Sequence, residues 1–190
     1  MTREYVRFAF AGGIALAGLS AATAPAVAQD LTISSSAFQD GGWLQQKNAG
    51  SNKANPNCVG DNVSPPLAFT NVPAKATSLA LLMFDPEGRG GAGVSHWVAY
   101  GIPVSVTGFA EGEVSKESPK YVGGLGTNKQ SIYLGPCTPP GPLHHYTFTL
   151  IATTLEAKEL PPGLTREQFF EKSDGKRLTA SGIVGLWKKK

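Results

Sequence analysis

Two uninterrupted apolar runs of strand length constrain the fold of this 190-residue chain most strongly. The first covers residues 78–84 and the second residues 96–102, and a glycine-rich loop separates them. Continuous apolar runs of this length are typical of strands that are buried on both faces. Asp85 directly follows the first run, and His96 begins the second. The pattern therefore predicts a β scaffold with a carboxylate and an imidazole at its rim, where scaffolds often present functional groups.

The composition favours a single, mainly β domain. Twenty-three Gly and 14 Pro predict many turns, which suits β structure better than a helix bundle. About 160 residues are enough for one domain with a sizeable core, and we assign residues 29–190 to it. Without Arg3, Arg7 and Glu4, the 17 basic and 14 acidic residues of the full chain become 15 and 13. A net charge this small predicts no nucleic-acid partner.

Residues 1–28 have the pattern of a secretory signal peptide. Two arginines near the start precede an apolar stretch at residues 8–19, and the triplet AVA at 26–28 is a small-x-small cleavage site. A membrane anchor is the alternative, but about 12 apolar residues are too few for a bilayer that needs roughly 20. We therefore expect cleavage near Ala28/Gln29 and a periplasmic or secreted protein.

Cys58 and Cys137 are the only cysteines. In an oxidising compartment an even pair more often forms a disulfide than stays reduced, although two buried thiols are the alternative. We predict the disulfide, which would tie the loop before Asp61 to the loop at Gly135 and Pro136.

Neither a cofactor nor a catalytic or metal site is predicted. The glycine-rich loop at residues 88–93 matches a dinucleotide-binding fingerprint only superficially, because no helix can follow it. The C-x-x-C and H-x-x-x-H spacings of metal sites do not occur in the sequence. A Gly-x-Ser-x-Gly nucleophile motif does not occur either, so nucleophilic and metal-dependent routes lack support.

Side chains alternate between the two faces of a strand, which predicts where the histidines point. In the run after the proline-rich turn, His144 shares a face with Tyr146, so both can line one pocket. His145 points the other way and is expected to be a bystander. In the second apolar run, the same rule puts His96 on the face of Val98.

The spacing of apolar residues changes in the C-terminal third of the chain. Thr165 to Gln168 has the pattern of a capping box that opens a short helix. Residues 178–186 are expected to form a second short helix or a turn packed on the sheet. The lysines at 188–190 are expected to be a solvated tail, with peripheral contact to an anionic membrane as the alternative.

Four motifs follow one another along the chain. They are Asp61-Asn62-x-Ser64-Pro65, Asp85-Pro86-Glu87, His96-Trp97-Val98, and Gly135-Pro136-Cys137-x-Pro-Pro-Gly followed by His144-x-Tyr146. Together they resemble the phosphatidylethanolamine-binding protein family, in its bacterial branch that is often labelled Raf-kinase-inhibitor-like. The resemblance implies an antiparallel β-sandwich of Greek-key type with short C-terminal helices, and a small surface pocket that takes phosphate-like anions.

Carried over motif by motif, the resemblance also implies a set of ligand-binding residues. The set is Asp85, His96, Gly135, Pro136, His144 and Tyr146, with Glu87 at its edge. The chain departs from the family pattern at three places. The family commonly has Asp at the position of Glu87, an aromatic residue where this chain has Val94-Ser95, and Arg at the position of His145.

The chemistry of these residues restricts the ligand. An anion beside the Asp85 carboxylate would be repelled unless a positive charge lies between them. A protonated His96 or His144, or an ammonium group of the ligand itself, can supply that charge. A zwitterion such as phosphoethanolamine therefore suits the site better than bare phosphate. We predict a small binding protein for phosphate-bearing, zwitterionic or phospholipid head-group ligands, and not an enzyme.

Two other functions stay open. The first is an inhibitor of another protein, a protease or a kinase, that would act through an exposed loop such as residues 115–130. The second is a hydrolase or lyase that would use Asp85 and a histidine as acid and base.

Overall fold

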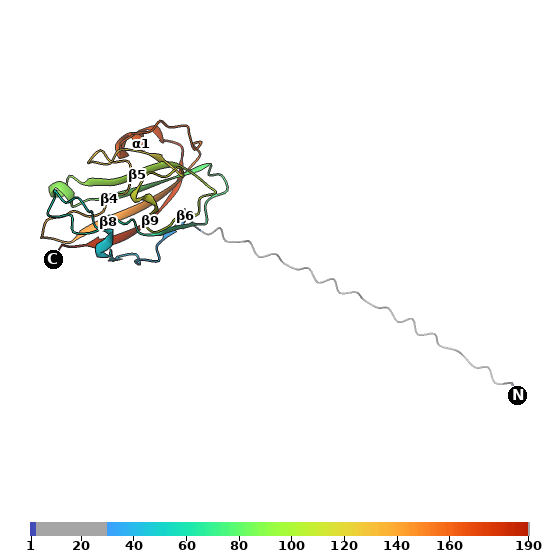
Figure 1. The fold of residues 1–190 in the computed structure, drawn as a ribbon. Coiled ribbons are helices and arrows are strands. Elements are labelled where there is room, and N and C mark those ends of the chain that lie inside the picture. Colours follow the sequence, from blue (N-terminus) through green and yellow to red (C-terminus); the bar gives the residue numbers. More distant parts are fainter. Residues whose placement is uncertain (3–29, 190) are drawn as a thin grey trace.

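The computed structural model describes residues 1–2 and 30–189, which form two β-sheets and one α-helix (Figure 1). Nearly all of the predicted signal peptide falls in residues 3–29 and so lies outside the described residues. The strands are β1 (Thr32–Ser34), β2 (Gly42–Trp43), β3 (Leu67–Thr70), β4 (Ser78–Asp85), β5 (Val94–Pro103), β6 (Gly108–Phe109), β7 (Val122–Gly123), β8 (His144–Thr153) and β9 (Arg177–Trp187). The helix α1 spans Arg166–Lys172, and single 3₁₀ turns span Gln46–Asn48, Gly88–Gly91 and Glu113–Ser115. Within the described ranges, no helix has the length and apolar character needed to cross a membrane.

The larger sheet has the strand order β2-β9-β8-β4-β5-β7, and the smaller sheet has the order β1-β3-β6. These pairings are antiparallel except for β2 with β9, which is parallel. The predicted mainly β class is confirmed, and the expectation of purely antiparallel pairing is wrong at this one edge. The Greek-key connection stays a prediction.

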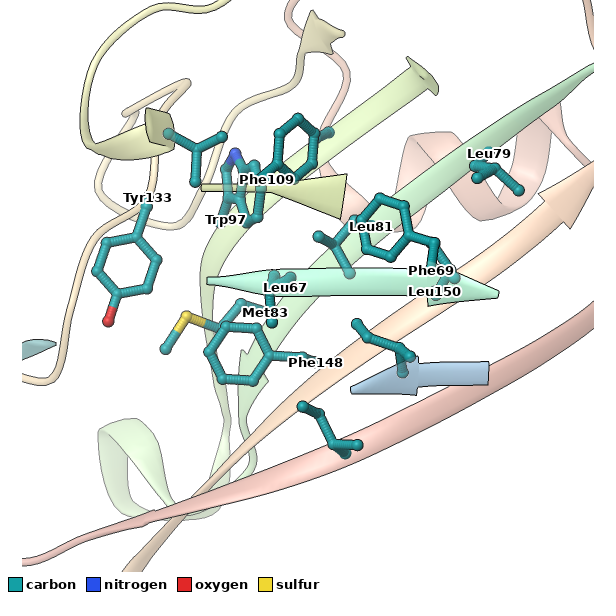
Figure 2. Packing of buried hydrophobic residues seen from close by; sticks show 14 of the residues in the cluster. Leu67, Phe69, Leu79, Leu81, Met83, Trp97, Phe109, Tyr133, Phe148 and Leu150 are labelled. Carbon is teal, nitrogen blue, oxygen red and sulfur yellow. The ribbon is translucent and has the colours of Figure 1, made fainter. Parts of the chain in front are cut away.

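The main core lies between the two sheets. Side chains from the small sheet, including Phe69 and Phe109, meet side chains from the large sheet, including Leu81 and Phe148, in one cluster (Figure 2). Each of these four side chains is no more than 2% exposed. Full burial of one such side chain stabilises a fold by about 1.5–3 kcal/mol, so the two apolar strand-length runs are buried as the sequence predicts.

Helix α1 covers part of the opposite face of the large sheet. Phe169 from this helix stacks on Tyr100 from β5, with ring centroids 5.7 Å apart, in a second cluster of buried residues. The helix begins at the predicted capping box, because the Thr165 hydroxyl accepts a hydrogen bond from the Gln168 N–H at 3.3 Å. Gln168 Oε1 in turn accepts the Thr165 N–H at 3.0 Å.

The prediction of a second short helix or a turn at residues 178–186 is wrong. These residues belong to β9, which pairs with β8 from His144 opposite Trp187 to Thr153 opposite Arg177. The backbone N–H and C=O groups of β8 need partners, and pairing with β9 provides them along the whole strand. This long-range pairing outweighs the weak local sequence pattern of residues 178–186.

Candidate functional site

A buried carboxylate–imidazole pair lies at the end of β4. Asp85 is its last residue and is only 1% exposed. Its Oδ2 accepts a hydrogen bond from Nδ1 of His144 at 2.8 Å. Its Oδ1 accepts the backbone N–H groups of Glu87 and Gly88 at 3.0 and 3.1 Å. A buried carboxylate is costly unless hydrogen-bonded, and these three donors satisfy it while they fix the orientation of the His144 ring.

A second acid–histidine pair lies beside the first and is more exposed. Glu87 accepts the Nδ1–H of His145 at 2.9 Å and the backbone N–H of His145 at 3.0 Å. Desolvation tends to raise the pKa of Glu87, but the hydrogen bonds from His145 outweigh it and lower the pKa below its ordinary value. The alternation of His144 and His145 along β8 is therefore confirmed, and His145 pairs with Glu87 at the edge of the cluster.

A β-bulge directs His96 into the same region. The pairing of β4 with β5 shifts by one residue between Met83 and Phe84, which leaves His96 as the extra residue. Bulges re-aim side chains in this way. The His96 ring packs edge-on against Tyr146, with centroids 5.0 Å apart, on the face of the main core. The expectation that His96 shares the face of Val98 is wrong, since Val98 belongs to the cluster on the opposite face.

The Leu134 carbonyl fixes the tautomer of His96. Its Nδ1 lies 2.8 Å from the Leu134 carbonyl oxygen, which can only accept, so Nδ1 carries the proton. Burial lowers the pKa of His96 below its ordinary value. At neutral pH the imidazole is therefore uncharged, and its Nε2 presents a lone pair. Of the two histidines expected to supply positive charge, His96 is unsuited, and His144 remains.

Tyr146 places a hydroxyl group beside the Asp85 carboxylate. The residue is fully buried, and its ring lies 6.4 Å from that of His144. No partner for the Tyr146 hydroxyl occurs within hydrogen-bonding geometry among the described residues. Burial, helped by the neighbouring Asp85 carboxylate, raises the pKa of Tyr146 far above its ordinary value. The hydroxyl therefore keeps its proton as a donor beside the Asp85 carboxylate, with which it interacts without forming a hydrogen bond of good geometry.

The Gly135–Pro136 loop forms the remaining side of the site through Leu134, whose carbonyl holds His96. The Gly135 N–H donates to Asn62 Oδ1 at 2.8 Å, so it is already used and not free for a ligand. The Pro136 carbonyl accepts the Gly50 N–H at 2.9 Å. A Cβ at position 135 would lie 2.8 Å from the carbonyl carbon of Ala49, so only glycine fits there. Gly135 and Pro136, both predicted to bind the ligand, therefore contribute to the site through their backbone atoms.

The predicted disulfide between Cys58 and Cys137 is formed. It joins the end of the Gly135–Pro136 loop to the segment that follows Asn48. Asn62 supports the same loop from the other side, because its Nδ2 donates to the Tyr133 carbonyl at 3.1 Å. The motif around Asn62 was visible in the sequence, but its part in holding the Gly135–Pro136 loop was not. Leu134 acts through its backbone carbonyl, which no sequence signal reveals.

One group of potential metal ligands occurs in the part of the chain that the structure describes. Asp85, Glu87 and His144 each offer a ligand atom, and these atoms lie within 4.8 Å of one another. The carboxylates and the His144 Nδ1 are already engaged in hydrogen bonds. A metal ion would have to displace these bonds, so the group fits a hydrogen-bonded binding site better than a metal centre.

The model of the family described as phosphatidylethanolamine-binding protein matches residues 34–188, nearly the whole described domain. The chain belongs to this family. The match spans every strand from β2 to β9 and all seven residues of the predicted ligand set.

Named relatives agree with this assignment. The chain is 36% identical over 137 residues to a UPF0098 protein of Chlamydia pneumoniae, a match that covers 70% of this chain and 87% of the relative. It is 38% identical over 149 residues to a Mycobacterium tuberculosis protein with the provisional name lipoprotein LppC, covering 77% and 67% of the two chains.

Solved structures agree on the fold. Escherichia coli YbcL, described as a new member of the mammalian family, superposes with a TM-score of 0.75 at 23% identity. That match covers 85% of this chain and all of the other. A Chlamydia trachomatis protein described as a homologue of the family superposes with a TM-score of 0.71 at 30% identity, covering 84% and 98%.

Proposed function

We propose that the protein binds a small zwitterionic ligand with a phosphate group, of the phospholipid head-group kind, at the cluster of Asp85, His96, His144 and Tyr146. The observation that carries this proposal is the buried Asp85–His144 pair, with the protonated Tyr146 hydroxyl beside it. A phosphate oxygen is a strong acceptor for donors of this kind. The family name, which refers to phosphatidylethanolamine, supports the same ligand class.

The charges of the cluster favour a zwitterion over a bare anion. Asp85 and Glu87 contribute two carboxylates, while neutral His96 offers an acceptor nitrogen. An ammonium group can donate to such acceptors, and the ligand phosphate can meet Tyr146 and His144. His144 and His96 are 8% and 5% exposed, and these exposed edges are where a ligand would enter. Glu87 and His145 border the entrance, since their side chains are 35% and 45% exposed.

Calorimetric titration with a panel of head groups tests the proposal. Phosphoethanolamine and glycerophosphoethanolamine should bind saturably, whereas phosphate and ethanolamine separately should bind at least roughly tenfold more weakly, or about 1.4 kcal/mol. If phosphate alone bound as tightly as phosphoethanolamine, the proposal of a zwitterionic ligand would be contradicted. Mass spectrometry of the recovered ligands should find them intact. Release of phosphate or ethanolamine would instead mean that Asp85 and His144 act as an acid–base pair in a hydrolase or lyase.

We also propose that the protein works outside the cytoplasm, in the periplasm or secreted. The signal-peptide pattern of the sequence, the Cys58–Cys137 disulfide and the lipoprotein name of one relative support this location. Inhibition of a protein target remains an alternative function. The loop considered for it, residues 115–130, is tied to the large sheet through β7 and through the Thr127 N–H, which donates to the Ser95 carbonyl.

A further inference from the structure

A groove of about 750 Å³ lies at the β2 edge of the large sheet, and the residues that form it are different from those of the Asp85 cluster. Three segments far apart in the sequence build it: β2 with the turn after it, the loop around Cys58, and the end of β9. Its volume is within the range of about 300–1,000 Å³ that is typical of small-molecule sites. The lining residues are Trp43, Leu44, Gln46, Val59, Trp187, Lys188 and Lys189.

The walls of this groove are fixed to one another. Gln46 Nε2 donates to the Val59 carbonyl at 3.0 Å, which joins the first wall to the second. The Lys189 ammonium donates to the Pro56 carbonyl at 2.8 Å, which joins the third wall to the same loop. Cys58 anchors that loop through the disulfide. The groove is therefore preformed, as ligand sites usually are.

Two tryptophans make the groove strongly apolar. The Trp43 side chain is 59% exposed, which leaves a large indole in contact with water. Trp187 is 7% exposed and lies deeper, next to the buried Leu44. An exposed aromatic side chain over a hollow is a common mark of a binding surface, because covering it removes apolar area from water.

The charged residues of the groove are both lysines. Lys188 is exposed, and the Lys189 ammonium is held by two neutral oxygens, those of the Pro56 carbonyl and of the Asn57 side chain. Among the ion pairs of the described residues, neither lysine takes part. Their positive charges are therefore available to an anionic ligand.

We propose that this groove is a second binding site, for an amphipathic anion: a single apolar chain or ring system that ends in a carboxylate, sulfate or phosphate. The apolar part lies against the two indoles, and the acidic group meets Lys188 and Lys189. A hollow of this volume holds one such molecule. The proposed ligand is therefore a single dissolved molecule, and the groove is not proposed to contact a membrane. Its lining residues are different from those of the proposed head-group site.

Calorimetry with decanoate below its micelle concentration tests the site. Decanoate should bind with one-to-one stoichiometry, while decyltrimethylammonium, with the same chain and the opposite charge, should bind at least roughly tenfold more weakly. Trp43→Ala should weaken decanoate binding by roughly tenfold, because an indole supplies much of the apolar contact. Lys188→Glu should weaken it by at least about threefold. Both residues are exposed, so neither change should disturb folding.

Matched controls separate the site from general adsorption. Leu178→Ala removes another exposed apolar side chain, and Lys158→Gln another exposed lysine, both outside the groove. Both variants should bind decanoate like the wild type. Equal binding of the two decyl probes, or unchanged binding by Trp43→Ala and Lys188→Glu, would overturn the proposal. Binding to phosphatidylglycerol vesicles without binding to monomeric decanoate would overturn it in favour of a membrane surface.

Discussion

At the scale of single residues, the kind of ligand that the site favours depends on which polar atoms have no hydrogen-bond partner within the protein. Asp85 is satisfied by three donors, and Glu87 by two. The Tyr146 hydroxyl is protonated and forms no hydrogen bond of good geometry among the described residues, and His96 is neutral with its Nδ1 fixed. The hydrogen bonds of His96 and His144 use Nδ1 of each ring, so the two Nε2 atoms and the Tyr146 hydroxyl are the groups that a zwitterionic ligand would meet.

The lowered pKa of His96 predicts a specific pH dependence of stability. Below its ordinary pKa of about 6.5 the unfolded chain takes up a proton that the folded chain does not. The free energy of unfolding should therefore be unaffected by His96 above about pH 6.5. It should fall as the pH drops towards the folded pKa, by up to about 1.4 kcal/mol per pH unit. His96→Asn keeps a donor for Leu134 and removes this titration.

Urea unfolding of both proteins between about pH 5 and pH 7.5 measures the difference. The wild type should lose stability relative to His96→Asn as the pH falls through this window. Glu87 does not interfere, because its pKa is already lowered below the ordinary value of 4.5. The same pH dependence in both proteins would mean that His96 is protonated in the folded state.

At the scale of elements, strand register decides which side chains enter the site. Along β8 the alternation is regular, so His144 meets Asp85 while His145 meets Glu87. Along β5 the bulge at His96 breaks the alternation and directs this ring towards Tyr146. A one-residue change of register in either strand would rearrange the site.

The register of β8 predicts unequal effects of its two histidines on ligand binding. His144→Ala should weaken phosphoethanolamine binding more than tenfold, since it removes the side chain that is bonded to Asp85. His145→Ala should stay within about threefold, or under roughly 0.7 kcal/mol, because this side chain is half exposed and contacts only the edge residue Glu87. Parallel calorimetric titrations give both values. A larger effect of His145→Ala would place the ligand on the Glu87 side.

The sequence predicted the strands that carry the site, because their apolar runs are continuous and their ends are polar. It also predicted α1, where Thr165 and Gln168 form a local capping signal. It failed at β9, whose first residues are exposed and interrupted by Gly182, so that no local alternation marks them. The sequence did not predict the bulge at His96 either, because a bulge depends on how β5 pairs with the neighbouring strand β4.

At the scale of the whole molecule, the disulfide joins the Gly135–Pro136 loop to a segment 79 residues away in sequence. The same region borders both the Asp85 cluster, through the Leu134 carbonyl that holds His96, and the groove of the two tryptophans, through Val59. Closing a loop of this length restricts the unfolded chain, which in the chain-entropy model stabilises the fold by on the order of 4 kcal/mol.

The double variant Cys58→Ser, Cys137→Ser should therefore unfold at a lower urea concentration, with a loss of roughly 2–5 kcal/mol. The native, unreduced protein should show no reaction with an alkylating agent by intact mass, whereas the reduced protein should gain two adducts. Two adducts without reductant would mean that the cysteines are free thiols in the native protein.

The most direct measurement is a calorimetric titration of phosphoethanolamine into the wild type and Asp85→Asn, with circular dichroism to establish that both are folded. Asp85 holds His144 through a charge-assisted bond, which is worth about 1.5–3 kcal/mol. We predict saturable binding by the wild type, binding at least roughly tenfold weaker by Asp85→Asn, and ligand recovered intact from both. A wild type that does not bind phosphoethanolamine, or a folded Asp85→Asn that binds it equally well, would contradict a head-group site built on Asp85.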